Sequence, residues 1–143
     1  MKFRSETSFK VPFHDIDIMN IAWHGHYLKY FEVGRTKLMQ DLGLDWPWLK
    51  DHNIAMPVVN IGIDYRRPLR YSEELLVSAE IREFSYPELE IYYTIFKKGD
   101  RKFRARGHSR QVYTKIDSQE LIYEVPSEVA IRFTENFDLR CDL

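Results

Sequence analysis

The spacing of the apolar residues changes along the chain, and this change restricts the folds that the sequence can adopt. Between about His24 and Leu42 the apolar side chains recur every three or four residues, which is the spacing of one helix face. The members of this face are Tyr27, Phe31, Gly34, Leu38 and Leu42, widened by Leu28, Tyr30 and Met39. Gly43 follows as a C-terminal stop. The sequence therefore predicts one long helix that buries a single face.

Outside this helix, apolar and polar residues alternate with the period of β-strands. The predicted strands cover residues 6–13, 56–65, 75–84, 89–97 and 102–115, and turn-like segments separate the later ones. Pro47 is expected near the start of a brief helix, and Ser127 is expected to cap a short helix that continues through about Phe133. The order predicts an α+β fold in a single domain, residues 1–143, with the later strands as an antiparallel meander and the helix packed on one sheet face. Because one helix cannot cover a broad sheet, dimerisation through a sheet edge or face is expected.

Charge and composition restrict the partners of the chain. A net charge of -1 gives no field that favours nucleic acid, and no zinc-finger or RNA-binding motif is present, so we expect no nucleic-acid partner. The N-terminus lacks the apolar run of a signal peptide, and no segment has the length of a membrane span, so we expect a cytoplasmic protein. The one cysteine, Cys141, cannot form an internal disulfide and is a poor candidate for a catalytic thiol.

Titratable residues concentrate between the first strand and the long helix. His14, Asp15, Asp17, His24 and His26 lie within thirteen positions there. A helix start offers backbone N–H groups without partners, and a nearby carboxylate could attack a carbonyl carbon or deprotonate a water that does. This combination suits acyl transfer.

Simpler interpretations of the same residues remain open at this point. Aspartates in loops commonly cap turns, and His24 or His26 could cap the helix or pack against aromatic rings. Histidine and aspartate also bind metals, but no HExxH or CxxC spacing is present, so we expect no metal site. Residues 107–111 carry half of a nucleophile elbow around Ser109, without its closing glycine and within a strand-like run, and we interpret it as chance.

The residues from Phe13 to Tyr27, continuing through Tyr30 to Arg35, resemble the opening of the 4-hydroxybenzoyl-CoA thioesterase-like hotdog family. Residues 64–68 and 72–75 resemble its second strand and the following turn. The resemblance implies a hotdog fold, an antiparallel sheet wrapped around one long central helix, with active sites at a dimer interface.

By this resemblance Asp17 matches the catalytic carboxylate, as nucleophile or general base. His24 matches the helix-start position whose backbone N–H polarises the thioester carbonyl, with Gly25 beside it. Asp15, Glu32 and Arg35 match motif positions that we interpret as structural, and the last two are spaced to pair on one helix face.

The sequence departs from the family pattern directly after Asp17. Asn20 stands where family members often have glycine, and asparagine is the residue other than glycine that best tolerates left-handed backbone. Ile18 and Met19 are bulkier than the residues of some members, which bears on the shape of the substrate.

The function that this resemblance implies is hydrolysis of an acyl-CoA, with coenzyme A as part of the substrate and no separate cofactor. Two sets of cations are candidates for its phosphates: Lys97, Lys98, Arg101, Lys102, Arg104 and Arg106 on one hairpin, and Arg66 with Arg67. Either set could equally be a solvated surface. Alternative functions are an acyl-carrier-protein thioesterase, a hotdog dehydratase, or a non-catalytic dimer that binds acyl-CoA. A homodimer or homotetramer is expected, and the acyl group is left open.

Overall fold

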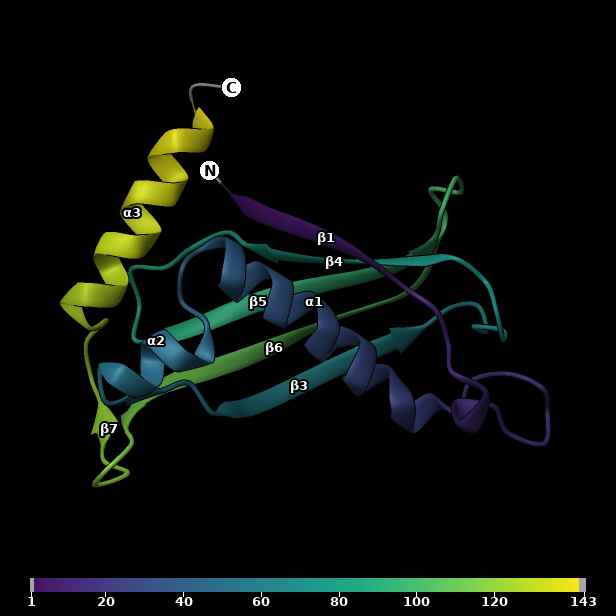
Figure 1. Cartoon of the computed structure of the whole chain (residues 1–143), viewed down its shortest axis with the longest axis horizontal. Coiled ribbons are helices and arrows are strands. Elements are labelled where there is room, and N and C mark those ends of the chain that lie inside the picture. The colour runs from purple at the N-terminus through teal and green to yellow at the C-terminus, as the bar shows by residue number, and fades with distance from the viewer. Residues whose placement is uncertain (1, 142–143) are drawn as a thin grey trace.

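A computed structural model describes the backbone of residues 2–141 and the side chains through Phe137. In chain order the elements begin with strand β1, two short 3₁₀ helices η1 and η2, and the long helix α1 (Figure 1). Their bounds are β1 Phe3–Phe9, η1 Phe13–Asp15, η2 His24–His26, α1 Tyr27–Asp41, α2 Trp46–Asp51, β2 Ile54–Ala55, β3 Val58–Tyr65, β4 Leu75–Ile81, β5 Glu88–Lys97, β6 Phe103–Lys115, β7 Leu121–Ile122 and α3 Ser127–Cys141. The predicted α+β order is confirmed.

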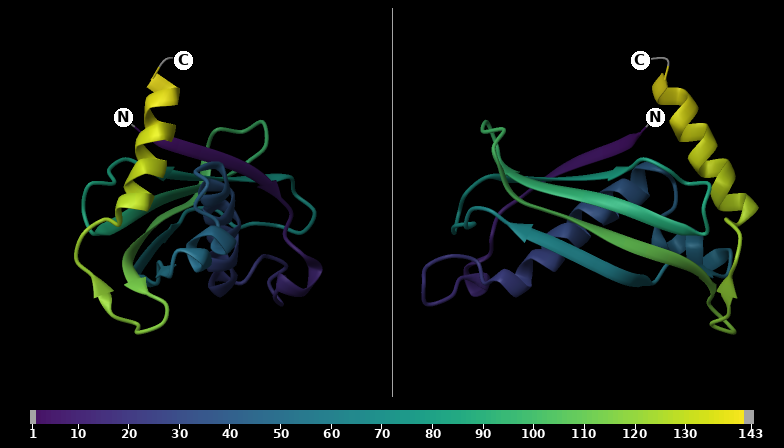
Figure 2. Two further views of the ribbon diagram at one scale, coloured as in Figure 1. Left: turned by 60° about the vertical axis from the view of Figure 1, so that its left-hand side comes forward. Right: turned by 180° about the vertical axis from the view of Figure 1, so that it is seen from behind.

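The strands form one antiparallel sheet in the spatial order β1-β4-β5-β6, with β3 on the far side of β6. β2 and β7 add short pairings to β6. The meander expected from the sequence is therefore wrong in one respect: β3 pairs with β6 and not with β4, which follows it along the chain. The segment after Tyr65 crosses the end of the sheet, so that β1 and β3 become its two edges (Figures 1 and 2).

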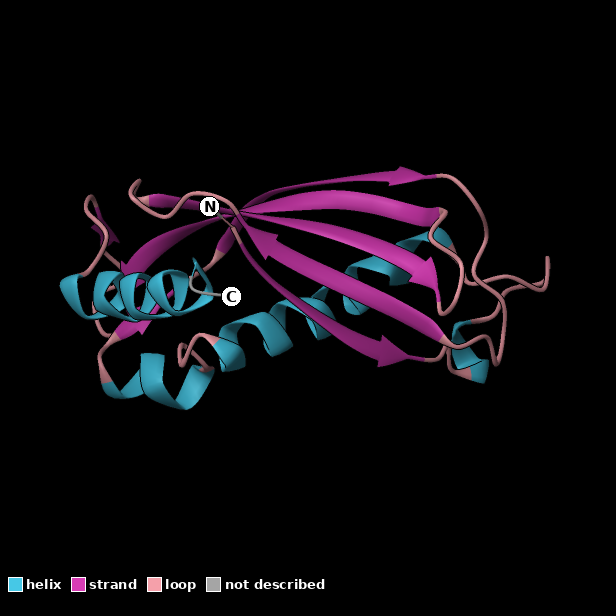
Figure 3. Ribbon diagram, turned by 90° about the horizontal axis from the view of Figure 1, so that it is seen from above, coloured by secondary structure: helices cyan, strands magenta, loops and turns pink. Residues whose placement is uncertain are grey.

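Helix α1 runs along the inner face of the curved sheet, with the strands forming a layer on one side of it (Figure 3). Its buried residues have the predicted spacing: Tyr27, Tyr30, Phe31, Gly34, Leu38 and Met39. Phe31 stacks on Tyr93 of β5 with ring centroids 4.6 Å apart, and full burial of such a side chain contributes about 2–3 kcal/mol. Gly34 allows the helix to approach β4, because an added Cβ would lie 2.9 Å from a Val77 methyl. Leu28 was expected on this face and is 40% exposed instead.

The first strand begins and ends earlier than predicted. β1 stops at Phe9, and Phe13 is 76% exposed in η1, where its ring meets Tyr71 edge to face. The β1–β4 ladder ends with Phe9 opposite Leu75, where β4 begins, and Pro12, which has no N–H to donate to a strand ladder, then precedes a helical turn. The predicted stop at Gly43 is confirmed, since this residue adopts a left-handed φ of 71°.

The two later helices close the end of the sheet away from η2 (Figure 2). Pro47 lies in the first turn of α2, as expected. α3 begins at Ser127 as predicted and continues beyond Phe133, because Phe133 and Phe137 both pack against Phe84. No helix within residues 2–141 combines the length and apolar character needed to cross a membrane.

Candidate active site

The loop that carries Asp17 closes on itself between η1 and η2. Ile16 pairs with Ala22 in an antiparallel bridge, the Asp17 N–H donates to the Ile21 carbonyl at 2.9 Å, and the Asn20 N–H donates to the Asp17 carbonyl at 3.0 Å. Asn20 has a φ of 65°, which is the left-handed conformation expected for it. The loop therefore keeps a tight turn without glycine, and it projects beyond the end of the sheet (Figure 1).

Asp17 lies at the start of this turn and caps it. Its side chain is half-buried, and its Oδ1 accepts the Met19 N–H at 2.8 Å. Ile18 and Met19 at the tip are 101% and 70% exposed. Of the two bulky residues that depart from the family pattern, Ile18 is fully exposed, and Met19 lines the same recess as Asp17.

The helix start opposite Asp17 is η2, which continues directly into α1. The His24 carbonyl accepts two hydrogen bonds, from the Tyr27 N–H and from the Tyr65 hydroxyl at 2.8 Å. No hydrogen bond among the described residues uses the His24 or Gly25 N–H as its donor, as expected for the first amides of a helix. An added Cβ at Gly25 would overlap the indole of Trp23, so glycine lets that ring lie across the helix start.

Asp15 has a different environment from Asp17, although it is only two residues away. It is 1% exposed, and its carboxylate accepts the Lys29 Nζ and the Tyr30 hydroxyl, each at 2.7 Å. Burial alone would raise the pKa of Asp15, but these hydrogen bonds outweigh it and hold the pKa below its usual value. His14 and His26 approach the same carboxylate at 3.5 and 3.8 Å.

The backbone of Asp15 also fixes the helix start, because its carbonyl accepts the Trp23 N–H at 3.1 Å. The structural interpretation of Asp15 is therefore confirmed. His26 packs edge to face on Trp23, in agreement with the packing role considered for it.

Asp17 and the helix start line one recess of about 520 Å³. The loop contributes Asp17 and His24, α1 contributes Tyr27, and the end of β3 contributes Tyr65, whose ring meets Tyr27 edge to face at 4.8 Å. Burial raises the pKa of both tyrosines, so both hydroxyls remain protonated at neutral pH. The recess thus combines the Asp17 carboxylate, the first residue of the helix start and a mainly apolar wall.

Tyr65 was not identified from the sequence as a site residue. The period of β3 placed it at the end of a strand, but its contact with the His24 carbonyl spans 41 positions and depends on how the sheet curves around α1. The signal that could have indicated Tyr65 is an aromatic side chain at the last position of a strand, on the same face of that strand as its core-facing residues.

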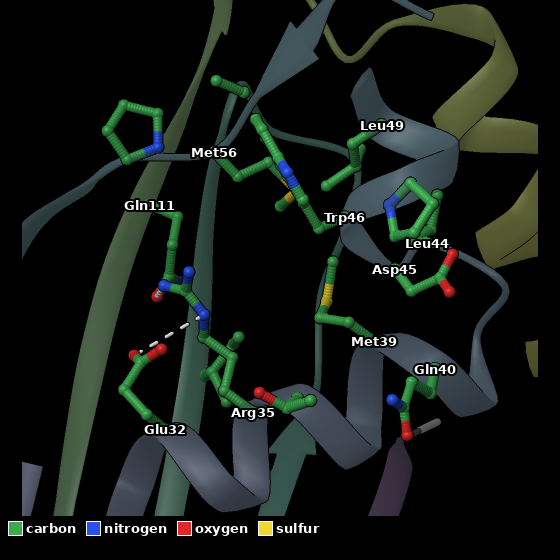
Figure 4. Close-up of a pocket in the computed structure, with 15 residues that line it drawn as sticks. Glu32, Arg35, Met39, Gln40, Leu44, Asp45, Trp46, Leu49, Met56 and Gln111 are labelled. Atoms are coloured by element: carbon green, nitrogen blue, oxygen red, sulfur yellow. Dashed lines mark hydrogen bonds and ion pairs between the residues drawn. The ribbon is translucent and has the colours of Figure 1, made fainter. Parts of the chain in front are cut away.

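A second cavity, also of about 520 Å³, lies farther along α1 between α2 and the sheet (Figure 4). Its wall is mainly apolar, and at one end Arg35 meets Glu32 at 3.7 Å and Gln111 at 3.5 Å. The expected pairing of Glu32 with Arg35 is confirmed. The two cavities share no lining residue, so Glu32 and Arg35 are separate from the Asp17 recess within one chain.

Other candidates for chemistry are not supported. Ser109 is 1% exposed within β6 and lies between the Tyr93 hydroxyl and the Gln111 side chain, so it cannot act as an exposed nucleophile. The side chain of Cys141 lies outside the described residues. Among the side chains that the structure describes, through Phe137, no three His, Cys, Asp or Glu come together as a potential metal site.

Comparison with known proteins identifies the family. The model of the thioesterase-like superfamily matches residues 11–133, which include the Asp17 loop, the helix start and the whole sheet after β1. The chain belongs to this superfamily. The resemblance on residues 13–35 is thereby confirmed, and it extends over most of the sequence.

Relatives within the superfamily include two curated bacterial proteins. YneP of Bacillus subtilis is 36% identical over 81 residues, which cover 57% of this chain and 59% of YneP. The long-chain acyl-CoA thioesterase FadM of Escherichia coli is 30% identical over 80 residues, covering 56% of this chain and 60% of FadM. The match thus spans about 60% of the length of these two relatives.

The solved structures establish the fold. The DHNA-CoA thioesterase of Staphylococcus aureus superposes with a TM-score of 0.83 at 22% identity, covering 97% of this chain and 94% of that one. The predicted hotdog fold, an antiparallel sheet wrapped around one long helix, is confirmed.

Proposed function

We propose that this chain hydrolyses acyl-CoA thioesters in the recess shared by Asp17 and the start of η2. The observation that supports the proposal is that Asp17 and His24 line one recess: Asp17 brings a half-buried carboxylate, and the N–H groups of His24 and of the adjacent Gly25 donate to no acceptor among the described residues. Amides aimed at the position where negative charge develops are a strong source of transition-state stabilisation in acyl transfer.

In the proposed reaction the thioester carbonyl oxygen accepts hydrogen bonds from the His24 and Gly25 amides, and its carbon faces Asp17. As general base, Asp17 takes a proton from water while the water oxygen bonds to the carbonyl carbon. The tetrahedral intermediate then expels the coenzyme A sulfur, which takes up that proton. As nucleophile, Asp17 would instead form an acyl anhydride that water hydrolyses in a second step. Both routes consume water and need no cofactor beyond the coenzyme A of the substrate.

The names of relatives support the substrate class. FadM is named a long-chain acyl-CoA thioesterase, and the Staphylococcus aureus structure is that of a DHNA-CoA thioesterase. Both names include coenzyme A, but they give different acyl groups. We therefore propose a coenzyme A thioester as the substrate and leave its acyl group open.

A panel of acyl-CoA substrates with detection of the released thiol tests this function. The panel should include short, long and aromatic acyl groups, with the matching acyl-carrier-protein thioesters and a crotonyl-CoA hydration assay beside it. We expect thiol release from at least one acyl-CoA at a rate well above the uncatalysed one. Tight binding without turnover of any thioester would refute hydrolysis in favour of a binding protein, and hydration of crotonyl-CoA would indicate a dehydratase.

We also propose that the chain forms a homodimer through the β3 edge of the sheet. Among the described strands none pairs with the outer side of β3, and Val58, Val59 and Ile61 are 40%, 53% and 40% exposed. An apolar, unpaired edge strand favours pairing with another chain. Sedimentation at micromolar concentration should give a dimer or tetramer, and Ile61→Lys should shift it toward monomer. A monomeric wild type would contradict the proposal.

A further inference from the structure

Two consecutive arginines follow β3 at the recess that contains Asp17. Arg66 and Arg67 both line this recess, and both side chains are exposed. Their backbone N–H groups donate to the same acceptor, the Arg104 carbonyl, at 2.9 and 3.0 Å. This shared hydrogen bond fixes the bend after Tyr65, so the two guanidinium groups start from a rigid point on the recess.

Contacts to Phe103 further restrict where the two guanidinium groups lie. Arg67 Nη1 donates to the Phe103 carbonyl at 3.4 Å, and the guanidinium carbon of Arg66 lies 5.9 Å from the centre of the Phe103 ring. A guanidinium has five N–H donors, so these contacts leave most donors available to a ligand. The protein therefore positions both arginines but accepts few of the hydrogen bonds that their guanidinium groups can donate.

Arg66 and Arg67 differ from most other candidate cations in having no carboxylate partner among the described residues. Neither forms an ion pair with any described residue. Four of the hairpin cations do face a carboxylate: Lys97 and Arg104 face Glu73 at 3.8 and 3.0 Å, Lys98 faces Glu74 at 4.0 Å, and Arg106 faces Asp64 at 3.9 Å. The pair at the recess therefore keeps its positive charge available.

Arg101 and Lys102 also have no ion pair with a described residue, but they lie at the turn between β5 and β6 and do not line the recess. They provide a matched control, two neighbouring exposed cations of the same charge outside the candidate site.

We propose that Arg66 and Arg67 form the subsite that binds phosphate groups of the coenzyme A moiety. This inference rests on the proposed function, because it assigns the anion that accompanies the thioester. Arg66 and Arg67 line the same recess as Asp17 and His24, so a thioester bound there would bring its coenzyme A moiety to the exposed arginines. Guanidinium groups match phosphate oxygens with two parallel hydrogen bonds, and exposed cations at the rim also attract a polyanion from solution.

Calorimetric titration of the double variant Arg66→Gln/Arg67→Gln tests the subsite without requiring turnover. The probes are coenzyme A and pantetheine, which lacks the phosphates. We expect the affinity for coenzyme A to fall at least about tenfold, and that for pantetheine by less than about twofold. The salt dependence of coenzyme A binding should also weaken, because fewer phosphate contacts remain. The control Arg101→Gln/Lys102→Gln should bind coenzyme A as the wild type does.

Three results would overturn the subsite. Equal coenzyme A affinity in the wild type and the double variant would show that the arginines do not contact the phosphates. Equal losses of affinity for coenzyme A and for pantetheine would show that the arginines only support the fold or bind another part of the ligand. A wild-type affinity for coenzyme A too weak to measure would also count against the subsite. Arginine-dependent coenzyme A binding without hydrolysis of any acyl-CoA would support the subsite and refute the proposed function, so the two failures are distinct.

Discussion

The hydroxyl of Tyr65 should control the orientation of the Gly25 amide, one of the two proposed oxyanion donors. Its hydrogen bond to the His24 carbonyl is 2.8 Å long. That carbonyl and the Gly25 N–H belong to one planar peptide unit and point in opposite directions, so fixing the oxygen also aims the N–H. In Tyr65→Phe the carbonyl keeps only its bond from the Tyr27 N–H. A net hydrogen bond contributes about 1 kcal/mol, which corresponds to about fivefold in rate if the loss falls on the transition state.

Steady-state kinetics on the best acyl-CoA of the panel measures this effect. We expect Tyr65→Phe to lower kcat about fivefold with little change in KM, because the amides contribute most when the oxyanion forms. Tyr71→Phe is the control, since Tyr71 is 56% exposed and contacts Phe13 through its ring. The unfolding midpoint in urea should change little for either variant. An unchanged kcat in Tyr65→Phe, or an equal loss in the control, would refute the reasoning.

The remaining predictions concern residues that hold the loop and the helix start. Asp15→Asn should lower the free energy of unfolding by about 2 kcal/mol at pH 7, because the buried carboxylate loses its charge-assisted bond from Lys29; denaturant unfolding measures this, and a loss below about 0.5 kcal/mol would contradict it. The pKa of Asp15 is lowered by folding, so its stabilisation is present above the usual carboxyl range and is lost as the pH falls through the folded pKa. The difference between wild type and Asp15→Asn should therefore shrink below about pH 4, and a difference that stays constant would oppose this assignment. Gly25→Ala should displace the Trp23 indole and slow turnover about tenfold, and Trp23→Ala in the same chain should restore most of the rate; a double variant as slow as Gly25→Ala alone would count against a steric cause.

The spacing of neighbouring residues was enough to predict the helices and strands of this fold. The pairing of strands that are distant in the sequence could not be predicted from it. The three-to-four spacing from Tyr27 to Leu38 and the left-handed stop at Gly43 depend on neighbours along the chain, so the sequence predicted α1 correctly. The pairing of β3 with β6 depends on a chain crossing between Tyr65 and Leu75, for which the sequence carries no local signal. Proline at position 12 did carry a local signal against a strand that continues through Phe13, and it precedes the helical turn η1.

In the candidate site, too, the residues close together in the chain were predicted, and the contacts between distant residues were not. Asp17, His24 and Gly25 were predicted from one short block, because the loop and the helix start are adjacent in the chain. The structure brings Asp17 and His24 to one recess, and separates Asp15 from Asp17 through burial against Tyr30, which a count of charges could not do. Their catalytic roles remain proposals.

The choice among the basic residues depended on strand register. Asp64 lies directly opposite Arg106 in the β3–β6 ladder, and Glu73 reaches Arg104 from the turn before β4. These carboxylates form ion pairs with arginines that the sequence had suggested as phosphate ligands. Arg66 and Arg67 stand out only once such pairings are known.

Single-turnover kinetics of Asp17→Asn tests the proposal that Asp17 carries out thioester hydrolysis. With enzyme in excess over the best acyl-CoA, we expect the hydrolysis rate to fall at least about a hundredfold, while calorimetry shows binding of the same thioester within about threefold of wild type. Asparagine keeps the size of the side chain and an oxygen for the Met19 N–H, so the loop should stay folded. Hydrolysis by Asp17→Asn at the wild-type rate would contradict the account.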